Sequence, residues 1–394
     1  MKKIIVGCSV LMVALSVVLA NDVPFVDYRQ VKKTDEEPVA AINTSKVEAD
    51  KNTVSSAPEA VTESQPRVVP KDKDAVPEQI TSPLGVSMKL KFHDEFDGVL
   101  DADGQRYVDR SKWLTTFWQG DSERSLWEGN KEVGLYVDKD FPSVLPREER
   151  VNPFSFEKSG VLTINATKFT PKQREAYVAA GKSLGKWYWK DLPYASGLLV
   201  SDGKFTFTYG YVEARLKLLA NRGAWPAFWM LPNHDGKHPW PPEIDILEFF
   251  GHRPTTFTSH IILPKGEKVP GWKITWYGGQ DKQVDANGKK VQTWATLRDK
   301  KDLFLTEDFH TWAVEWNEKE MAFFFDGKEL ARGDISGCPS LHKPMYLLIN
   351  LAIGGRWFSD ESWQLGQHVG PADVDEASMP WKMECDYVRV YQAD

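Results

Sequence analysis

The sequence predicts an all-β fold, a sandwich or a barrel, on two observations. Short stretches rich in β-branched and aromatic residues recur along the chain between Gly, Pro, Asn or Asp residues, as is typical of strands joined by turns. These stretches are Leu162–Ala166, Lys204–Thr208, Tyr211–Leu218, Trp312–Trp316, Met321–Phe325, Met345–Asn350 and Tyr387–Tyr391. Helical periodicity is scarce, and Pro171–Ala180 is the best candidate for a short helix. Asp326-Gly327, between Phe325 and Lys328, predicts a tight hairpin turn.

Residues 1–20 are predicted to be a secretory signal peptide. Lys2 and Lys3 precede an apolar run, Ile4–Leu19, and Val18-Leu19-Ala20 has small or modest side chains at the two positions that a signal peptidase checks, so cleavage is expected after Ala20 or nearby. An uncleaved membrane anchor is the alternative, because the run is only slightly short for a membrane span. We therefore expect a secreted, periplasmic or cell-surface protein without a membrane segment in its mature form.

Residues 21–85 are predicted to be a disordered polar linker. No aromatic residue occurs from Gln30 to Gly85, and Lys, Glu, Asp, Ser, Thr, Pro, Ala and Val dominate the segment. Such a composition cannot bury enough apolar surface to offset the entropy of ordering. One catalytic domain is predicted over residues 86–394, where all 16 tryptophans lie.

The composition excludes several classes of protein. The chain carries 49 Lys and Arg against 56 Asp and Glu, a formal net charge of -7, which argues against a nucleic-acid partner. A hydrophobic content of 41% is too low for a multi-span membrane protein. The numerous Trp side chains have broad faces that suit sugar rings. The alternative is that most of them form a large aromatic core. After removal of the signal, Cys338 and Cys385 remain, either as one disulfide or as buried free thiols.

The chemistry is predicted in the hexapeptide E-I-D-I-L-E that begins at Glu243. In an extended strand, Glu243 and Asp245 point to one face and the two isoleucines to the other, into apolar packing. Continued alternation would bury Glu248 among apolar side chains, which is costly. A β-bulge, with one extra residue in the strand, returns Glu248 to the acidic face. We therefore expect three carboxylates on one surface.

Three crowded carboxylates without a basic partner repel one another, which raises at least one carboxyl pKa and separates the roles of acid and base. Glycoside hydrolysis uses two carboxyl groups in different protonation states, one on each side of the glycosidic bond that is cleaved. A separation of about 5–5.5 Å would mean retention of configuration, and a wider gap inversion. A solvated acidic strand or a calcium site is the alternative.

The neighbouring sequence adds a family resemblance. Gly223–Pro232, followed by Pro242–Glu248, resembles the signature of glycoside hydrolase family 16. The similarity covers most of residues 88–392 in the expected order, through Tyr194–Leu198, Tyr209–Leu218, Phe309–Asp326, Pro344–Trp357 and Asp386–Gln392. The resemblance implies a β-jelly-roll sandwich of two antiparallel sheets with a concave cleft for a polysaccharide, and endo-acting, retaining β-glycanase activity.

The resemblance also implies roles for the acidic residues. Glu243 would be the nucleophile, Glu248 the general acid/base, and Asp245 would hydrogen-bond the nucleophile and tune its charge. Two residues separate Asp245 from Glu248. This spacing is similar to that of the laminarinases, agarases and carrageenases, whereas the lichenases have one residue there.

Aromatic residues near this strand are the predicted sugar-binding platforms. Trp225 and Trp229 share one face of a strand, and Trp240 lies three residues before Glu243. The resemblance implies that all three line subsites beside the cleavage point, with core packing as the alternative for Trp229. His260, in the expected strand Thr256–Leu263, would face the cleft or be a structural residue.

Further substrate-binding candidates lie away from this strand. Asn130 and Glu132 fall in a segment that resembles the family's substrate-binding edge, and Trp357 follows a Gly-Gly pair. Four tryptophans lie in less familiar loops, where binding and packing both remain open: Trp118, Trp127, Trp187 and Trp189.

Members of the family often carry a structural calcium on the convex face, and the resemblance implies Glu95 and Asp386 as its side-chain ligands. Hard oxygen donors suit calcium. We expect no cofactor for catalysis, since no Cys/His spacing suggests zinc and no Gly-rich phosphate loop is present. The expected form is a monomer with a polysaccharide substrate.

The leading substrate prediction is a β-1,3- or β-1,3-1,4-glucan. Six lysines within Pro264–Thr296 favour sulfated or carboxylated chains unless the loop is simply solvated, so a marine galactan (agar, porphyran or carrageenan) and a bacterial exopolysaccharide are alternatives. Two further alternatives are a transglycosylase, using the same intermediate with a sugar acceptor, and a non-catalytic carbohydrate-binding jelly roll.

Overall fold

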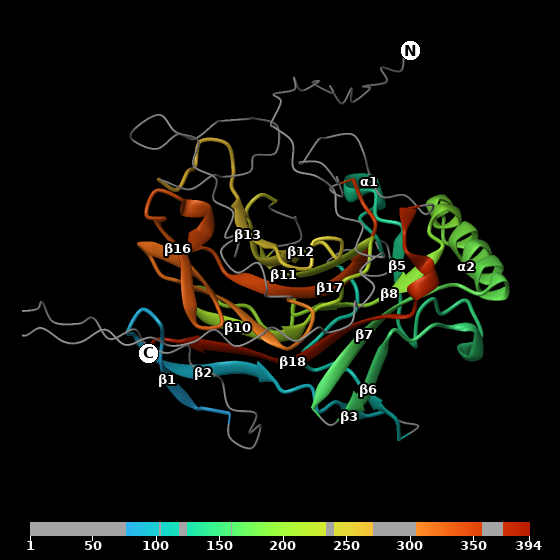
Figure 1. The fold of residues 1–394 in the computed structure, drawn as a ribbon, viewed down its shortest axis with the longest axis horizontal. Coiled ribbons are helices and arrows are strands. Elements are labelled where there is room, and N and C mark those ends of the chain that lie inside the picture. Colours follow the sequence, from blue (N-terminus) through green and yellow to red (C-terminus); the bar gives the residue numbers. More distant parts are fainter. Residues whose placement is uncertain are drawn as a thin grey trace, which may run out of the picture. The chain divides into compact units, whose positions relative to one another are not determined.

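The computed structural model is a sandwich of β-sheets, which confirms the predicted fold class (Figure 1). The structure describes residues 76–101, 104–117, 124–158, 160–233, 240–270, 305–356 and 373–394. The predicted signal peptide, most of the predicted linker, Trp118 and Trp357 lie outside the described residues. No helix in the described part of the chain is long and apolar enough to cross a membrane.

The larger sheet runs in the order β16-β15-β14-β10-β18-β7-β8-β5, with β2 and β6 pairing beside β18 and β7, and β1 beside β2. All of its pairs are antiparallel except β5 with β8. Its strands are β1 (Gln79–Thr81), β2 (Ser87–Asp94), β5 (Gly134–Tyr136), β6 (Phe154–Lys158), β7 (Val161–Lys168), β8 (Tyr194–Ser196), β10 (Gly210–Lys217), β14 (His310–Trp316), β15 (Glu320–Phe325), β16 (Lys328–Asp334) and β18 (Trp381–Gln392).

The smaller sheet has five strands in the order β13-β12-β11-β17-β9, all antiparallel. They are β9 (Leu198–Val200), β11 (Ala224–Pro232), β12 (Glu243–Phe249), β13 (Phe257–Ile262) and β17 (Met345–Ile353). A separate hairpin joins β3 (Val99–Leu100) to β4 (Arg106–Tyr107). The acidic hexapeptide forms most of β12, which lies between β11 and β13.

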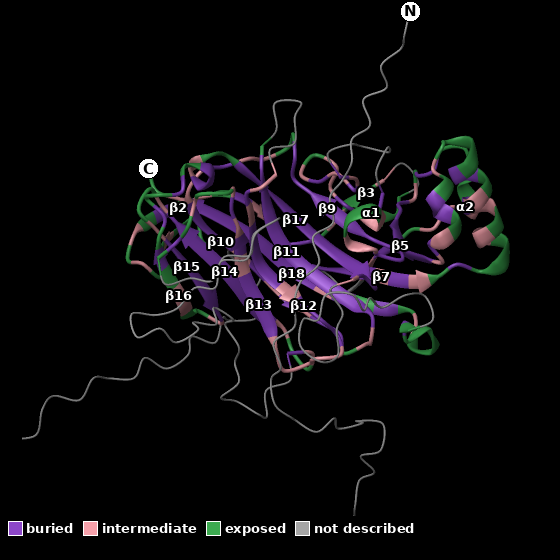
Figure 2. Ribbon diagram, turned by 90° about the horizontal axis from the view of Figure 1, so that it is seen from above, coloured by how far each residue is buried: buried purple, intermediate pink, exposed green. Residues whose placement is uncertain are grey.

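The main hydrophobic core lies between the two sheets. Alternate residues of β12, such as Ile244 and Ile246, pack in one cluster with Val212 of β10 and Val388 of β18. Each such side chain contributes about 1.5–3 kcal/mol when it is fully buried. The strands are accordingly buried along most of their length (Figure 2). The alternation leaves the opposite face of the smaller sheet available for the site.

The predicted hairpin turn is confirmed. Phe325 of β15 pairs with Lys328 of β16, and the two residues between them have positive φ angles, 47° at Asp326 and 73° at Gly327. Two positive φ values are the signature of the turn whose twist suits a two-residue hairpin, and Gly reaches that conformation without steric cost.

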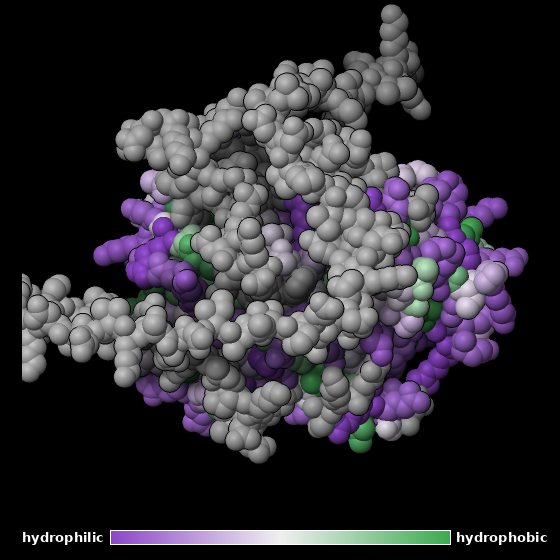
Figure 3. Space-filling model, viewed as in Figure 1, coloured by the Kyte–Doolittle hydropathy of each residue, from purple (hydrophilic) through white to green (hydrophobic). Residues whose placement is uncertain are grey.

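The predicted helix is also present and extends further, as α2 (Pro171–Ser183). The Thr170 hydroxyl accepts a hydrogen bond from the Gln173 backbone, and the Gln173 side chain accepts one from the Thr170 backbone, which together form a capping box. The other helices are short: α1 (Trp127–Asn130), η3 (Arg147–Glu149), η4 (Trp187–Asp191), η5 (Pro339–His342) and η7 (Glu376–Ser378). On the α2 side, the visible described surface is largely hydrophilic with small apolar areas (Figure 3).

Three details differ from the expectations or resolve them. Gln79–Thr81 pairs with Ser87–Lys89, so the sheet begins before the predicted domain boundary at Val86. Lys204–Thr208 is not a strand, because only Phe207 makes a bridge, with Met345. Cys338 and Cys385 are buried free thiols.

Candidate active site

The predicted bulge is present in β12. Asp245 pairs with His260 of β13 and Glu248 pairs with Thr258, so two residues of β12 oppose the single Ser259. The Ser259 hydroxyl donates to the carbonyl of Ile246 at 2.8 Å, which satisfies the backbone at the bulge. Both bulge residues enter the main core. Glu248 therefore shares the face of Asp245, as the alternation argument predicts.

Cross-strand pairing gathers the other site residues around this bulge. On β11, Ala227 lies opposite Glu248 and Trp229 lies opposite Asp245. On β13, His260 lies opposite Asp245. Three adjacent strands thus place an indole, a carboxyl group and an imidazole in one row across the sheet.

Each carboxyl group of the trio Glu243, Asp245 and Glu248 has a specific nitrogen neighbour. The indole N–H of Trp240 donates to Glu243 Oε2 at 2.7 Å, and that of Trp225 donates to Glu248 Oε1 at 3.1 Å. The Nε2 atom of His260 lies 2.9 Å from Asp245 Oδ2, and its Nδ1 atom lies 3.4 Å from Glu248 Oε2. Within the described residues, no Lys or Arg pairs with the trio.

Burial dominates the electrostatics of the trio. Burial raises the pKa of Glu248 to about 7; Asp245 and Glu243 add to the rise, while His260 and the Trp225 indole oppose it. Burial also raises the pKa of Asp245 to about 7. The pKa of Glu243 is raised by burial and then by the nearby charge of Asp245. The site therefore holds protons at a pH where isolated carboxyl groups would have lost them.

Glu243 and Asp245 form a coupled pair. Their carboxyl groups share a hydrogen bond, which requires a proton on one of them. The indole N–H of Trp240 only donates, so it stabilises a negative charge on Glu243. The shared hydrogen bond raises the pKa of Glu243 and lowers that of Asp245, while the hydrogen bond from Trp240 opposes the rise at Glu243. The two carboxyl groups therefore titrate as a unit.

Trp229 is joined to Asn130 by a chain of hydrogen bonds that passes through three further side chains. Its indole donates to Asn350 Oδ1 at 2.7 Å, and Asn350 Nδ2 donates to the Tyr136 hydroxyl at 3.0 Å. That hydroxyl donates to Glu132 at 3.1 Å, and Asn130 Nδ2 donates to the same carboxyl group at 3.2 Å. The chain fixes the orientation of the Trp229 indole.

Asn350 and Tyr136 are members of this chain of hydrogen bonds that were not predicted from the sequence. Asn350 is the one polar side chain in the apolar strand β17, and that break in the pattern is the signal that would have drawn attention to it. Tyr136 gave no such signal, because a buried Tyr in a short apolar strand looks like ordinary core.

The expected calcium ligands, Glu95 and Asp386, each contact an arginine. Glu95 accepts two hydrogen bonds from the Arg389 guanidinium, at 3.0 and 2.7 Å, which occupy both carboxylate oxygens. Asp386 Oδ2 contacts Arg215 Nη1 at 2.5 Å. A calcium site needs six to eight oxygen ligands. In the described structure both side chains are instead paired with arginines, and the calcium ligand set stays a prediction.

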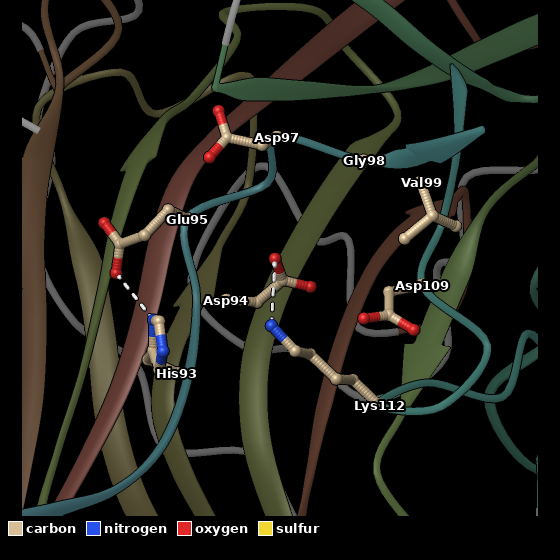
Figure 4. Close-up of a pocket in the computed structure, with 8 residues that line it drawn as sticks. All are labelled: His93, Asp94, Glu95, Asp97, Gly98, Val99, Asp109 and Lys112. Carbon is tan, nitrogen blue, oxygen red and sulfur yellow. Dashed lines mark hydrogen bonds and ion pairs between the residues drawn. The ribbon is translucent and has the colours of Figure 1, made fainter. Parts of the chain in front are cut away.

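A pocket beside Glu95 shows the same use of carboxylates (Figure 4). Asp94 accepts from the Trp113 indole at 2.8 Å and lies 3.9 Å from Lys112, while His93 lies 3.4 Å from Glu95. Asp97, Gly98, Val99 and Asp109 complete its lining. Among the described residues, only Asp245, Glu248 and His260 bring three ligand atoms within 4.8 Å of one another, as a metal would require.

Comparisons with known proteins agree with the fold and the site. The family model of the glycosyl hydrolases family 16 matches residues 149–366. The endo-1,3-1,4-beta-glycanase EglC of Rhizobium meliloti is 31% identical over 303 residues, which cover 77% of this chain and 51% of that protein. The beta-glucanase of Rhodothermus marinus is 32% identical over 213 residues, 50% of this chain and 63% of that protein.

A solved structure is similar over nearly its whole length. The endo-beta-1,3-glucanase from Pyrococcus furiosus has a TM-score of 0.55 and 27% identity, covering 80% of this chain and 98% of that one. By contrast, the chain spans about half the length of the first curated relatives it matches. Since the family model covers more than half of the sequence, this chain belongs to the glycosyl hydrolases family 16.

Proposed function

We propose that this protein is a retaining endo-β-glycanase that hydrolyses internal bonds of a β-1,3- or β-1,3-1,4-glucan. One observation carries the proposal. Three carboxyl groups share one face of a bulged strand, and within the described residues their partners are indole N–H groups and one imidazole rather than Lys or Arg. Such a set retains protons for general acid catalysis while one carboxylate stays ionised as a nucleophile.

In the proposed first step, Glu243 attacks the anomeric carbon and forms a glycosyl ester. Glu248 gives its proton to the glycosidic oxygen, whose bond to the anomeric carbon breaks, and the reducing-end part of the chain leaves as an alcohol. The raised pKa of Glu248, about 7, keeps that proton available at mildly acidic pH. The hydrogen bond from Trp240 to Glu243 Oε2 favours the ionised nucleophile.

In the second step, water attacks the same carbon, Glu248 accepts the proton of that water, and the Glu243 carboxylate is released. Two inversions at one carbon give retention. Asp245 acts on Glu243 through their shared hydrogen bond. Trp225 and Trp240 each donate to a carboxyl group of the trio, and Trp229 lies opposite Asp245 on the neighbouring strand. These three indoles are the proposed contacts for the sugar rings.

The substrate class is supported by the names of the relatives. They include two endo-1,3-1,4-beta-glycanases of Rhizobium meliloti and a glucan endo-1,3-beta-glucosidase of Niallia circulans. A relative from Penaeus monodon, 24% identical over 250 residues, is named a beta-1,3-glucan-binding protein. Binding without hydrolysis is therefore the second candidate function.

The proposed function includes export as a monomer. The support is the charged and apolar pattern of residues 1–20. Mass spectrometry of the protein recovered outside the producing cell should give an N-terminus at or near Asn21, and light scattering should give the mass of one chain. A chain retained in the cell with an intact Met1 would contradict the proposed export.

The test of the activity is a reducing-end and product-size assay with purified protein. Laminarin and mixed-linked glucan are the main substrates, with agarose, porphyran, carrageenans and a bacterial exopolysaccharide as competitors, and Glu243→Gln is the control. Oligosaccharides released from a glucan only by the unsubstituted protein would support the proposal. Retardation of both proteins in a glucan gel without any product would instead favour the binding protein.

The stereochemistry needs its own measurement. Proton NMR of the first product formed should show the β-anomer before mutarotation, because two displacements at one carbon restore the configuration. An initial α-anomer would mean inversion and would remove Glu243 from the role of nucleophile.

A further inference from the structure

Trp187 is an exposed indole outside the site described above. It is the first residue of η4 and 58% of its surface is accessible, whereas Trp189, two residues later, is 1% exposed. Among the exposed large apolar side chains of the described residues, Trp187 alone is aromatic. An indole that remains more than half exposed gains little from burial, so packing of the core does not account for its position.

The exposed ring is held by two other aromatic rings. Trp127 meets Trp187 with ring centroids 5.3 Å apart and an interplanar angle of 85°, and Tyr188 meets it at 6.2 Å and 89°. Trp127 and Tyr188 in turn stack on each other at 5.6 Å and 15°. These edge-to-face contacts keep the Trp187 ring upright on a stacked aromatic pair.

The segment that carries Trp187 is anchored to α2. The Arg174 guanidinium donates to the carbonyl oxygens of Trp189 at 2.7 Å and Leu192 at 3.0 Å, and also to that of Lys190. A Cβ atom on Gly181 would lie 2.8 Å from the Cβ of Trp189, so only glycine permits this close approach. η4 is thus a rigid support rather than a loose loop.

This aromatic group lies beside the candidate active site. Trp225, whose indole donates to Glu248, and Asn130 both lie against Gly355. A Cβ atom placed on Gly355 would lie 2.9 Å from the Trp225 ring and 3.1 Å from the Asn130 carbonyl oxygen. Asn130 is the last residue of α1 and Trp127 is the first. The helix α1 therefore links Trp225, at the carboxyl group of Glu248, to the exposed Trp187. Figure 1 shows α1 between the smaller sheet and α2.

Two lysines add polar groups at the edge of this surface. The Nζ of Lys131 lies 4.5 Å from the centroid of the Trp127 ring, and that of Lys190 lies 5.6 Å from the Trp187 ring. A sugar ring has an apolar C–H face that suits an indole and a rim of hydroxyl groups that accept from ammonium groups. An exposed indole flanked by such donors has the chemistry to bind sugar units.

We propose that Trp187, together with Trp127, Tyr188, Lys131 and Lys190, forms a distal binding surface for the same glucan chain that is cleaved at Glu243 and Glu248. This inference, which we refer to as the Trp187 surface, rests on the proposed function. The surface binds sugar units beyond those at the scissile bond. Its effect therefore increases with the length of the substrate.

The test compares Trp187→Ala with Leu184→Ala, a change at an exposed apolar residue between α2 and η4 that lies outside the Trp187 surface. Both changes are made in the Glu243→Gln protein, and binding of laminarin and mixed-linked glucan is measured by affinity electrophoresis. Trp187→Ala is expected to weaken binding of the polymer by about tenfold, the loss of one stacked ring, while Leu184→Ala changes it less than twofold.

Kinetics of the active protein give a second readout. With Trp187→Ala, the loss of kcat/KM on polymer should exceed the loss on a glucan tetrasaccharide by about tenfold. Equal binding by the two alanine variants, or equal kinetic losses on polymer and tetrasaccharide, would overturn the Trp187 surface while leaving the proposed function intact. Failure of the unsubstituted protein to bind or cleave any glucan would instead overturn the proposed function.

Discussion

Two groups of buried carboxyl groups in this protein have opposite surroundings. Asp138, which is 3% exposed, lies 3.3 Å from the Arg124 guanidinium and accepts from the Thr115 hydroxyl at 2.7 Å. Burial opposes its ionisation, but Arg124, Arg110 and these hydrogen bonds prevail and hold its pKa below the ordinary value. Burial raises the pKa of Asp245 and Glu248 to about 7, and the described nitrogen group that lies beside both of them is the His260 imidazole.

The difference shows what a buried carboxyl group can do. Paired with an arginine, as at Asp138, Glu95 and Asp386, it joins separate segments of the chain through an ion pair. Without such a partner, as in the trio Glu243, Asp245 and Glu248, it keeps a proton near neutral pH and is available to transfer it. The same residue type thus serves structure in one region and is available for chemistry in the other.

The largest expected effect is the loss of turnover on removing a carboxyl group of the trio. Glu243→Gln and Glu248→Gln should each reduce kcat on the order of 10³-fold, because an amide can neither attack the anomeric carbon nor donate the required proton. Initial rates on the best glucan of the panel measure this, with thermal unfolding to verify the fold. Activity near that of the unsubstituted protein for both variants would show that the trio is not catalytic.

The next effect concerns stability at the paired site. Asp138→Asn leaves the buried charge of Arg124 without its counter-ion and should lower the free energy of unfolding by about 3–5 kcal/mol. Urea denaturation measures this change. Asp140→Asn is the matched control, because the Asp140 side chain is 56% exposed and its pairs contribute less than about 1 kcal/mol. Equal losses for the two variants would contradict the structural role of the Asp138 pair.

A smaller effect is the pH dependence of stability at Glu248. The unfolded chain loses this proton near pH 4.5, whereas the folded protein keeps it up to about pH 7. The contribution of Glu248 to the free energy of unfolding is therefore fully present below pH 4.5 and is lost as the pH rises through 7. Glu248→Gln should gain stability relative to the unsubstituted protein between pH 4.5 and 8, by at most about 3 kcal/mol.

Thermal unfolding of Glu248→Gln and the unsubstituted protein at pH 4.5 and at pH 8 measures this gain in stability. Asp138→Asn provides the opposite case, because the pKa of Asp138 is lowered in the folded state. The Asp138–Arg124 pair stabilises the folded protein fully above the pKa that Asp138 has in the unfolded chain, and this stabilisation is lost only at lower pH. The loss of unfolding free energy in Asp138→Asn should therefore become smaller on acidification. If the change in unfolding free energy does not depend on pH in either variant, the contrast between the two sites is wrong.

The smallest expected effect is a shift of the pH–rate profile. Activity should fall above about pH 7 as Glu248 loses the proton it donates. His260 lowers the pKa of Glu248, so His260→Asn should move this basic limb to higher pH and change kcat/KM at the optimum by less than about tenfold. A limb that stays in place would mean that another group limits the rate at high pH.

Much of the fold and the site followed from local patterns. Strand periodicity and Asp326-Gly327 predict the β15–β16 hairpin, since both are read from neighbouring residues. The bulge in β12 follows from the cost of burying Glu248 alone. Lys204–Thr208 has the same strand-like composition and is not a strand, because pairing depends on which segments lie alongside it.

The all-β class and the placement of three carboxyl groups on one face can be inferred from the order of residues, because alternation and turn chemistry act over a few residues. Which carboxyl groups pair with arginines depends on the folded chain. Arg389 reaches Glu95 across 294 positions of sequence, and Arg215 reaches Asp386 across 171. The folded chain also decides that Trp189 is buried and Trp187 exposed. Charge pairing and burial depend on distances in space, which the order of residues leaves undefined.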